Sequence, residues 1–285
     1  MKRSSTYGGP GEQENIQEMP LVTDKSNELV DERGLPRYFD MQAKLGYTKH
    51  IGGAGATREL LNLCQISSEK TLLNLGCGAG TTTPFIVNNY NCDVVAIDIK
   101  ENMLESAVKW AKRKEVTGKA RFTVADAQYL PFANESFDIL ICESVNVFIP
   151  DKRQAFGEYH RVLKPGGALG INEAVLTKEP PENAAALLAD YVGNDILPTA
   201  FWVDQFHAAG FTKLISREYQ VQMRDESRSQ LGFFTTRDYL GLLCNMLKVT
   251  FGQDPYVRDL AKRSLSNPRD FYDFFGYGLI IGWKS

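Results

Sequence analysis

The stretch TLLNLGCGAGTTT, residues 71–83, decides how this chain folds. An apolar strand runs directly into three glycines at alternate positions, Gly76, Gly78 and Gly80. Glycine has no Cβ, so the turn can adopt positive φ and let a ligand approach the main chain closely. Thr81 to Thr83 and Pro84 then predict the first turn of a helix, whose N–H groups lack partners. The pattern predicts a strand, a ligand-binding turn and a helix in succession.

The spacing of the glycines bears on the kind of ligand. The dinucleotide fingerprint G-x-G-x-x-G would require a glycine where this chain has Thr81. No Lys or Arg lies between Gly76 and Thr83, which argues against a phosphate-bearing ligand. A tight turn without any ligand is the alternative interpretation of so short a pattern.

The segment NCDVVAIDIK, residues 91–100, reads as a second buried strand whose end carries Asp98. In a parallel α/β sheet, adjacent strands end at the same edge, so Asp98 should lie beside the glycine loop. A carboxylate there could accept both hydroxyls of a ribose. A solvated aspartate at a strand end is the alternative.

Three further strands follow in the same pattern. RFTVADAQYLPF ends a third strand at Asp126, and FDILICES ends a fourth at Glu143 and Ser144. The Asp126 carboxylate could pair with the amino group of an adenine while Ala127 offers its N–H to the ring, although a strand-end aspartate is often only a turn former. RVLKPGGALGINEAV then predicts a sharp turn at residues 164–167 between a helix and a fifth strand.

In this order, the five segments resemble the class I S-adenosylmethionine-dependent methyltransferases, most closely the branch with quinone, sterol and other small-molecule methyltransferases. The resemblance covers roughly residues 50–220. It implies an α/β fold with a Rossmann-like, seven-stranded, mostly parallel sheet, the last strand antiparallel, and helices on both faces. It also implies S-adenosylmethionine as the cofactor and methyl transfer to a small-molecule acceptor by in-line displacement.

The resemblance also assigns roles to particular residues of this chain. The glycine loop would flank the methionine part of the cofactor, and Asp98 would hold the ribose. Ile99 and Met103 would pack on the adenine. Asp126 and Ala127 would contact its edge. The cofactor-binding residues implied in this way are Gly76, Cys77, Gly78, Gly80, Asp98, Ile99, Met103, Asp126 and Ala127.

Candidate residues for the acceptor side lie at strand ends and before the first strand. Glu143 is the leading contact for the acceptor or for the cofactor amine, and Glu173 is the second. In the resembled family, the segment before the first strand often covers the cofactor, which makes Tyr47 a cofactor contact and His50 a third catalytic candidate. For the two glutamates a structural hydrogen bond, and for Tyr47 and His50 simple packing, is the alternative.

The organisation along the chain predicts a flexible leader and one domain. Residues 1–34 are rich in Gly, Ser, Glu, Gln and Asn and form the leader, and residues 35–285 form a single methyltransferase domain. Its expected parts are a lid segment at 35–66, a cofactor-binding core at 67–220, a helical insertion at 223–268 and a final strand at 270–283. We expect the two helices of the insertion to pack over the acceptor site or to form a homodimer contact.

Composition excludes several classes of protein. The 285 residues include 32 basic and 35 acidic ones, and the basic segment at 109–121 reads as a solvated helix face, so no nucleic-acid partner is expected. Five cysteines without C-x-x-C spacing read as small buried residues of a reducing compartment, and three distant histidines predict no metal site. The absence of a long apolar stretch and of a signal core predicts no stable membrane insertion and a cytoplasmic location.

Two other functions stay open at this point. An NAD-type oxidoreductase would share the strand, the loop and the acidic strand end, although Thr81 and the Asp126–Ala127 segment count against it. A non-catalytic regulator that binds S-adenosylmethionine would keep the loop and lack an acceptor pocket. The sequence does not specify the acceptor, the methylated atom or the pathway.

Overall fold

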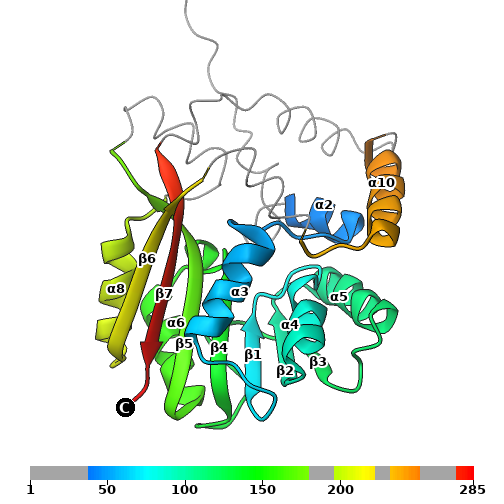
Figure 1. Ribbon diagram of the computed structural model, residues 1–285. Helices are drawn as coiled ribbons and strands as arrows, with labels where there is room; N and C mark the ends of the chain where they lie inside the picture. The colour runs from blue at the N-terminus through cyan, green and yellow to red at the C-terminus, as the bar shows by residue number, and fades with distance from the viewer. Residues whose placement is uncertain (1–37, 180–195, 222–231, 251–273) are drawn as a thin grey trace, which may run out of the picture.

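The computed structural model describes residues 38–179, 196–221, 232–250 and 274–285. A seven-stranded sheet forms its centre, with helices on both faces (Figure 1). The strands are β1 (Thr71–Leu75), β2 (Asp93–Asp98), β3 (Ala120–Val124), β4 (Phe137–Glu143), β5 (Leu163–Leu176), β6 (Thr212–Gln220) and β7 (Phe275–Trp283). The helices are α2 (Tyr38–Leu45), α3 (Gly53–Leu63), α4 (Thr82–Tyr90), α5 (Glu101–Arg113), η1 (Asn146–Phe148), α6 (Lys152–Val162), α8 (Thr199–Ala208) and α10 (Thr236–Thr250).

The order of the strands across the sheet is β3-β2-β1-β4-β5-β7-β6. The first five strands run parallel, and β7 lies antiparallel between β5 and β6. This confirms the Rossmann-like fold with an antiparallel last strand. From β1 the strands are added towards one edge of the sheet as far as β3, and from β4 towards the other edge. Ligands of open α/β sheets bind outside the carboxyl ends of the strands at such a switch point.

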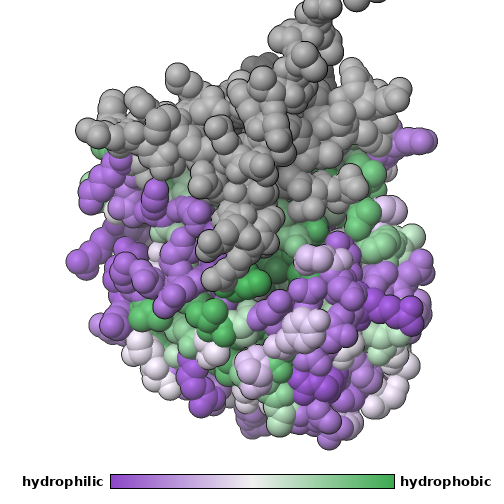
Figure 2. Space-filling model, turned by 180° about the vertical axis from the view of Figure 1, so that it is seen from behind, coloured by the Kyte–Doolittle hydropathy of each residue, from purple (hydrophilic) through white to green (hydrophobic). Residues whose placement is uncertain are grey.

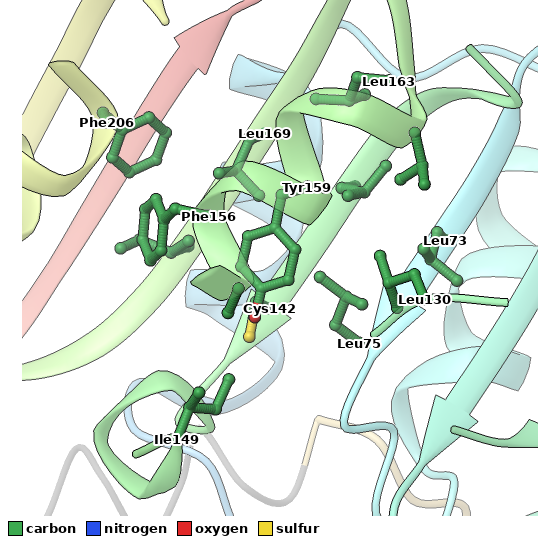
Figure 3. Packing of buried hydrophobic residues seen from close by; sticks show 14 of the residues in the cluster. Leu73, Leu75, Leu130, Cys142, Ile149, Phe156, Tyr159, Leu163, Leu169 and Phe206 are labelled. Carbon is green, nitrogen blue, oxygen red and sulfur yellow. The ribbon is translucent and has the colours of Figure 1, made fainter. Parts of the chain in front are cut away.

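Successive side chains along each strand point to opposite faces of the sheet, so the core has two layers. One face carries Leu72, Ile139 and Ile141 and packs against α3, α4 and the end of α5. The other face packs against α6 and α8, and Figure 3 shows Phe156 and Tyr159 of α6 lying over Leu75, Cys142 and Leu169. Each fully buried Leu or Phe side chain contributes about 1.5–3 kcal/mol of burial free energy, so both layers stabilise the sheet.

Two aromatic side chains of α8 lie in the core. Trp202 and Phe206 of α8 are both fully buried, and Phe206 packs against Phe156 with ring centroids 5.3 Å apart. Of the five cysteines, four are buried as expected, whereas Cys244 on α10 is exposed. That expectation was wrong for Cys244, because the outer face of α10 is not covered by any described element.

Several expected boundaries are corrected by the structure. The second strand starts at Asp93 because Asn91 ends α4 with φ at +55°, and the fourth ends at Glu143 because Ser144 has φ at +57°. Residues 164–167 do not separate a helix from the fifth strand. They form a bulge inside β5, because Phe137 pairs with Leu163 and the next β4 pair already involves Ala168.

The helix after the glycine loop begins at Thr82, as the sequence predicts, but no threonine side chain caps it. Thr81 is the N-cap residue, and its side chain makes no capping hydrogen bond. The final strand begins at Phe275 rather than at 270, and residues 270–273 lie outside the described residues. The expected leader at 1–34 and the second helix of the insertion also lie outside them.

Two helices, α2 and α10, lie beyond the carboxyl ends of the parallel strands (Figure 1). α2 and α10 lie next to each other above α5, and α3 lies in front of the sheet (Figure 1). In the rear view of Figure 2, hydrophilic residues cover the flanks and hydrophobic residues gather towards the middle. Among the described residues, no helix combines the length and the apolar character needed to cross a bilayer.

Candidate active site

The glycine loop joins β1 to α4 and holds its three glycines in a left-handed backbone. φ is +62° at Gly76, +55° at Gly78 and +89° at Gly80, a conformation that residues with a Cβ rarely adopt. The N–H of Cys77 donates to the carbonyl of Ile97 at 2.8 Å and ties the loop to β2. The sequence pattern therefore folds into a fixed, open backbone turn at the edge of the sheet.

Asp98 lies at the carboxyl end of β2, beside this loop. Its Oδ2 accepts the N–H of Gly78 at 2.9 Å, and its Oδ1 accepts the N–H of Lys100 at 2.9 Å. Burial raises the pKa of the Asp98 carboxyl, and the N–H groups of Lys100 and Gly78 work in the opposite direction. Because a carboxylate has about four lone-pair sites, two bonds to the backbone leave acceptor capacity for a ribose diol.

The next two residues expected around an adenine follow Asp98 on the chain. Ile99 is half-buried directly after β2, before α5 begins. Met103, in the first turn of α5, is buried with Ala43 of α2 and Ala79 of the glycine loop. Met103 therefore packs beneath the glycine loop, whereas Ile99 keeps part of its surface accessible.

Asp126 and Ala127 lie beyond the end of β3, both half-buried. The strand does not extend to Asp126 as predicted but ends at Val124, because the Asp126 side chain accepts the N–H of Gln128 at 2.8 Å and turns the chain. The N–H of Ala125 still donates to the carbonyl of Asp98 at 3.1 Å. The turn is thus held next to the end of β2, as the proposed adenine site requires.

A buried polar cluster occupies the carboxyl end of β4. Glu143 Oε1 accepts the hydroxyl of Thr57, on α3, at 2.9 Å and lies 3.7 Å from Nδ1 of His50. The other ring nitrogen of His50 lies 3.4 Å from the hydroxyls of both Thr57 and Thr82. Glu143 is 8% exposed, and its Oε2 is buried without a hydrogen-bond partner among the described residues. The cluster joins β4 to the first turn of α4 and leaves one carboxylate oxygen for a ligand.

Residues 46–52, which we call the strap, connect α2 to α3 across this site. The hydroxyl of Thr48 accepts the N–H of Ala79 at 2.6 Å, so the strap contacts the glycine loop directly. At its other end, Ile51 accepts a bond from Asn172 at 2.8 Å and donates to the hydroxyl of Ser144 at 3.3 Å. Thr48 is a residue that sequence reasoning missed, since nothing in its neighbourhood distinguishes it from the adjacent Tyr47 and Lys49.

Glu173 lies on the opposite face of the sheet from Glu143. Glu143 pairs with Asn172 in the β-sheet register, so Glu173, one residue further on, points towards α6. Its Oε1 accepts the N–H groups of Val145 and Asn146 at 3.1 and 2.8 Å and the amide of Asn146 at 2.8 Å. The structure therefore brings Glu143 and His50 together but keeps Glu173 apart from them.

Glu173 is fully buried, and this burial has a consequence for stability. Burial raises the pKa of Glu173 from 4.5 to about 7, against the opposing hydrogen bonds from Asn146 and Val145. A carboxyl whose pKa is higher in the folded state contributes stability below its unfolded pKa and loses that contribution as pH rises through its folded pKa.

For this reason, Glu173→Gln should change how stability depends on pH. Between pH 4.5 and about 7, the free energy of unfolding of the wild type should fall relative to that of the variant by roughly 3 kcal/mol. Urea unfolding of both proteins across this range measures the difference. Glu218→Gln, at an exposed position of β6, is the control, and a Glu173→Gln profile parallel to the wild type would contradict this account.

These residues fit S-adenosylmethionine as a cofactor. The molecule carries no phosphate, and no Lys or Arg lies in the loop from Gly76 to Thr83. It carries a ribose diol, for which Asp98 keeps acceptor capacity, and an ammonium, for which the unpartnered Oε2 of Glu143 offers a buried hydrogen-bond acceptor. Among the described residues, no group of three or more His, Cys, Asp or Glu could hold a metal ion.

Comparisons with known proteins agree with this geometry. A family model described as a methyltransferase domain matches residues 73–171. Methyltransferase GfsG of Streptomyces halstedii is 28% identical over 233 residues, covering 80% of this chain and 78% of the relative. Phosphoethanolamine N-methyltransferase 3 of Arabidopsis thaliana is 23% identical over 228 residues, covering 75% of this chain and 46% of the relative.

A solved structure shares the fold. The phosphoethanolamine N-methyltransferase 2 of Haemonchus contortus, in complex with phosphomonomethylethanolamine and S-adenosylhomocysteine, superimposes with a TM-score of 0.66 at 16% identity. The match covers 86% of this chain and 56% of that one. At this identity the likeness concerns the fold.

The fold is α/β, and the candidate site at the carboxyl ends of the first strands fits a phosphate-free nucleoside. The methyltransferase-domain model at residues 73–171 and the methyltransferase relatives support a class I S-adenosylmethionine-dependent small-molecule methyltransferase. Its cofactor is S-adenosylmethionine. The resemblance drawn from the sequence is thereby confirmed, whereas the roles of the individual site residues stay proposals.

Proposed function

We propose that this chain transfers a methyl group from S-adenosylmethionine to a small-molecule acceptor bound beside Glu143 and His50. The observation that carries the proposal is the buried Oε2 of Glu143, which has no partner among the described residues and lies in a cluster joined to the first turn of α4. An unpaired buried carboxylate is costly unless a cation or a hydrogen-bond donor meets it. The ammonium of the cofactor meets that need.

Each cofactor-side residue then has a proposed task. The glycine loop with Cys77 lies along the methionine part, and Asp98 accepts the ribose hydroxyls. Ile99 lies against the adenine, Met103 supports the loop from below, and Tyr47 of the strap covers the cofactor. Asp126 and Ala127, held beside β2 by the bond from Ala125 to Asp98, contact the adenine edge.

The chain's contribution to the reaction is chiefly alignment and exclusion of water. When bound, S-adenosylmethionine supplies an electrophilic methyl group on a sulfonium. The strap and the ends of β4 and β5 bury the reacting region, and correct positioning of two reactants contributes up to about 7–11 kcal/mol. His50, with its Nδ1 3.7 Å from Glu143, is the group placed to take a proton from the acceptor, whereas Glu173 positions the loop after β4.

The acceptor side is bordered by aromatic rings. Phe233 lies edge-on to the ring of His50, with centroids 5.2 Å apart, and to that of Phe85, with centroids 5.3 Å apart. These rings favour an acceptor with an apolar or planar part. A small-molecule acceptor without a nucleic-acid partner, and a cytoplasmic location, belong to the same proposal. Neither the oxidoreductase nor the non-catalytic regulator is supported by the comparisons reported above.

Methyl transfer is tested with methyl-labelled S-adenosylmethionine and an extract of small metabolites. The full chain should release S-adenosylhomocysteine and move the label into a metabolite whose mass grows by one methyl group. Glu143→Gln should reduce this turnover by about tenfold or more, since a hydrogen bond to a charged group contributes about 1.5–3 kcal/mol.

The matched control is Glu101→Gln, an exposed glutamate in the first turn of α5, which should leave turnover unchanged. Binding of S-adenosylmethionine without any transfer of label to the extract would contradict an enzymatic function and support the regulator. Equal turnover in wild type and Glu143→Gln would contradict the role of Glu143.

A further inference from the structure

The described part of the insertion packs on the strap. It includes Phe233, Phe234 and α10, and two of its side chains contact the strap. Phe233 contacts His50, and Phe234 contacts the ring of Tyr47 with centroids 5.2 Å apart. Two consecutive phenylalanines thus cover the two strap residues that the sequence singles out.

The strap is also held from below by α5. The indole N–H of Trp110 donates to the carbonyl of Gly46, the first residue of the strap, at 2.6 Å. Phe234 packs on the same Trp110 ring, with centroids 5.7 Å apart. The start of the strap is therefore enclosed between α5 and the insertion.

Polar contacts fix α10 in this place. The amide of Asn245 donates to the carbonyl of Leu45, the last residue of α2, at 3.0 Å. Asp238, 7% exposed, pairs with Lys114 at 2.5 Å and accepts both the N–H and the hydroxyl of Thr235 at 2.7 Å. α10 is thus bound at its first turn to the end of α5 and further along to the end of α2.

The strap in turn closes on the cofactor side, where Thr48 accepts the N–H of Ala79. Displacing the strap from the glycine loop requires it to break contacts with the insertion as well, because the same seven residues make both sets of contacts. Lid movements of this kind often set the rate of product release in enzymes.

We propose that residues 233–245, which we call the latch, hold the strap closed and thereby set the rate at which S-adenosylhomocysteine leaves. This rests on the proposed function, since it takes the glycine loop as the cofactor site. It assigns the insertion a role on the cofactor side, beyond the acceptor-side or dimer contact expected from the sequence.

The test is the dissociation rate of labelled S-adenosylhomocysteine from the full chain, chased with an excess of unlabelled compound. Phe234→Ala removes ring contacts with both Tyr47 and Trp110 and should speed dissociation by about tenfold. Amide hydrogen exchange of residues 46–51, without cofactor, should rise in the same variant. Phe234→Tyr keeps the ring and should restore the wild-type rate.

Leu247→Ala, at a position of α10 that is 49% exposed and lies outside the latch, is the matched control and should change neither measurement. If Phe234→Ala does not fold, Phe234→Leu keeps the bulk, loses the ring contacts and takes its place. Unchanged dissociation and exchange in the folded variant would overturn the latch while leaving the proposed function intact. A wild type that binds no S-adenosylhomocysteine would overturn both.

Discussion

Gly78→Ala is expected to lower the affinity for S-adenosylhomocysteine by about a hundredfold or more. The backbone of Gly78 has φ at +55°, which costs a residue with a Cβ about 1–2 kcal/mol. The added Cβ would also lie 2.4 Å from the hydroxyl oxygen of Thr48. The strap would have to move away from the loop, so the closed site could not form. Isothermal titration calorimetry of both proteins measures the loss.

The control for this substitution is Gly118→Ala, in the connection between α5 and β3. No atom outside its neighbours lies within 4 Å of a Cβ at Gly118, and its φ is not positive. It should bind as the wild type does. An unchanged affinity of Gly78→Ala would mean that close approach of the cofactor to this loop is not required.

Asp98→Asn is expected to weaken binding by about a hundredfold, through two effects. An amide binds a ribose diol less strongly than a carboxylate, and hydrogen bonds to charged groups contribute about 1.5–3 kcal/mol each. In addition, both carboxylate oxygens of Asp98 accept backbone N–H groups, from Gly78 and Lys100. The amide nitrogen of Asn would face one of these donors and leave it unpaired.

Asp93→Asn makes the same chemical change at the exposed, opposite end of β2 and should leave affinity unchanged. Compounds without a ribose diol separate the two effects. A 2′,3′-dideoxy form of S-adenosylhomocysteine should bind wild type and Asp98→Asn with a smaller difference than the natural compound does. Equal losses for both compounds would assign the whole effect to the loop and contradict a ribose contact.

The features that the sequence predicted are local ones. A strand that ends in alternating glycines and the strand ends at Asp98 and Glu143 each lie in a short segment. The residue pattern of such a segment is sufficient to indicate its local structure. The parallel sheet then places them at one edge, because neighbouring parallel strands end together. For this reason the fold and the position of the loop beside Asp98 were predictable.

The face on which each glutamate lies could not be predicted. Side chains alternate along a strand, so the side taken by Glu173 depends on the register of β5 against β4. The bulge at residues 164–167 shifts that register, and a bulge of this length is not visible in a Pro-Gly-Gly sequence that also suits an ordinary turn. The sequence therefore grouped Glu173 with Glu143, which the sheet separates.

The contacts of the strap could not be predicted from the sequence either. Thr48 meets Ala79, and Asn245 meets Leu45, across long separations along the chain. No spacing rule connects such residues. Phe233 and Phe234 read only as part of an amphipathic helical segment, although in the structure they precede α10 and pack on the strap.

Calorimetric titration of the full chain with S-adenosylhomocysteine and, separately, with NAD tests the central claim most directly. The claim is that a phosphate-free nucleoside binds at the ends of β1 and β2, between the glycine loop and Asp98. We predict saturable binding of S-adenosylhomocysteine, weakened by Asp98→Asn, and no heat of binding with NAD. Binding of NAD, without any response to S-adenosylhomocysteine, would contradict the claim.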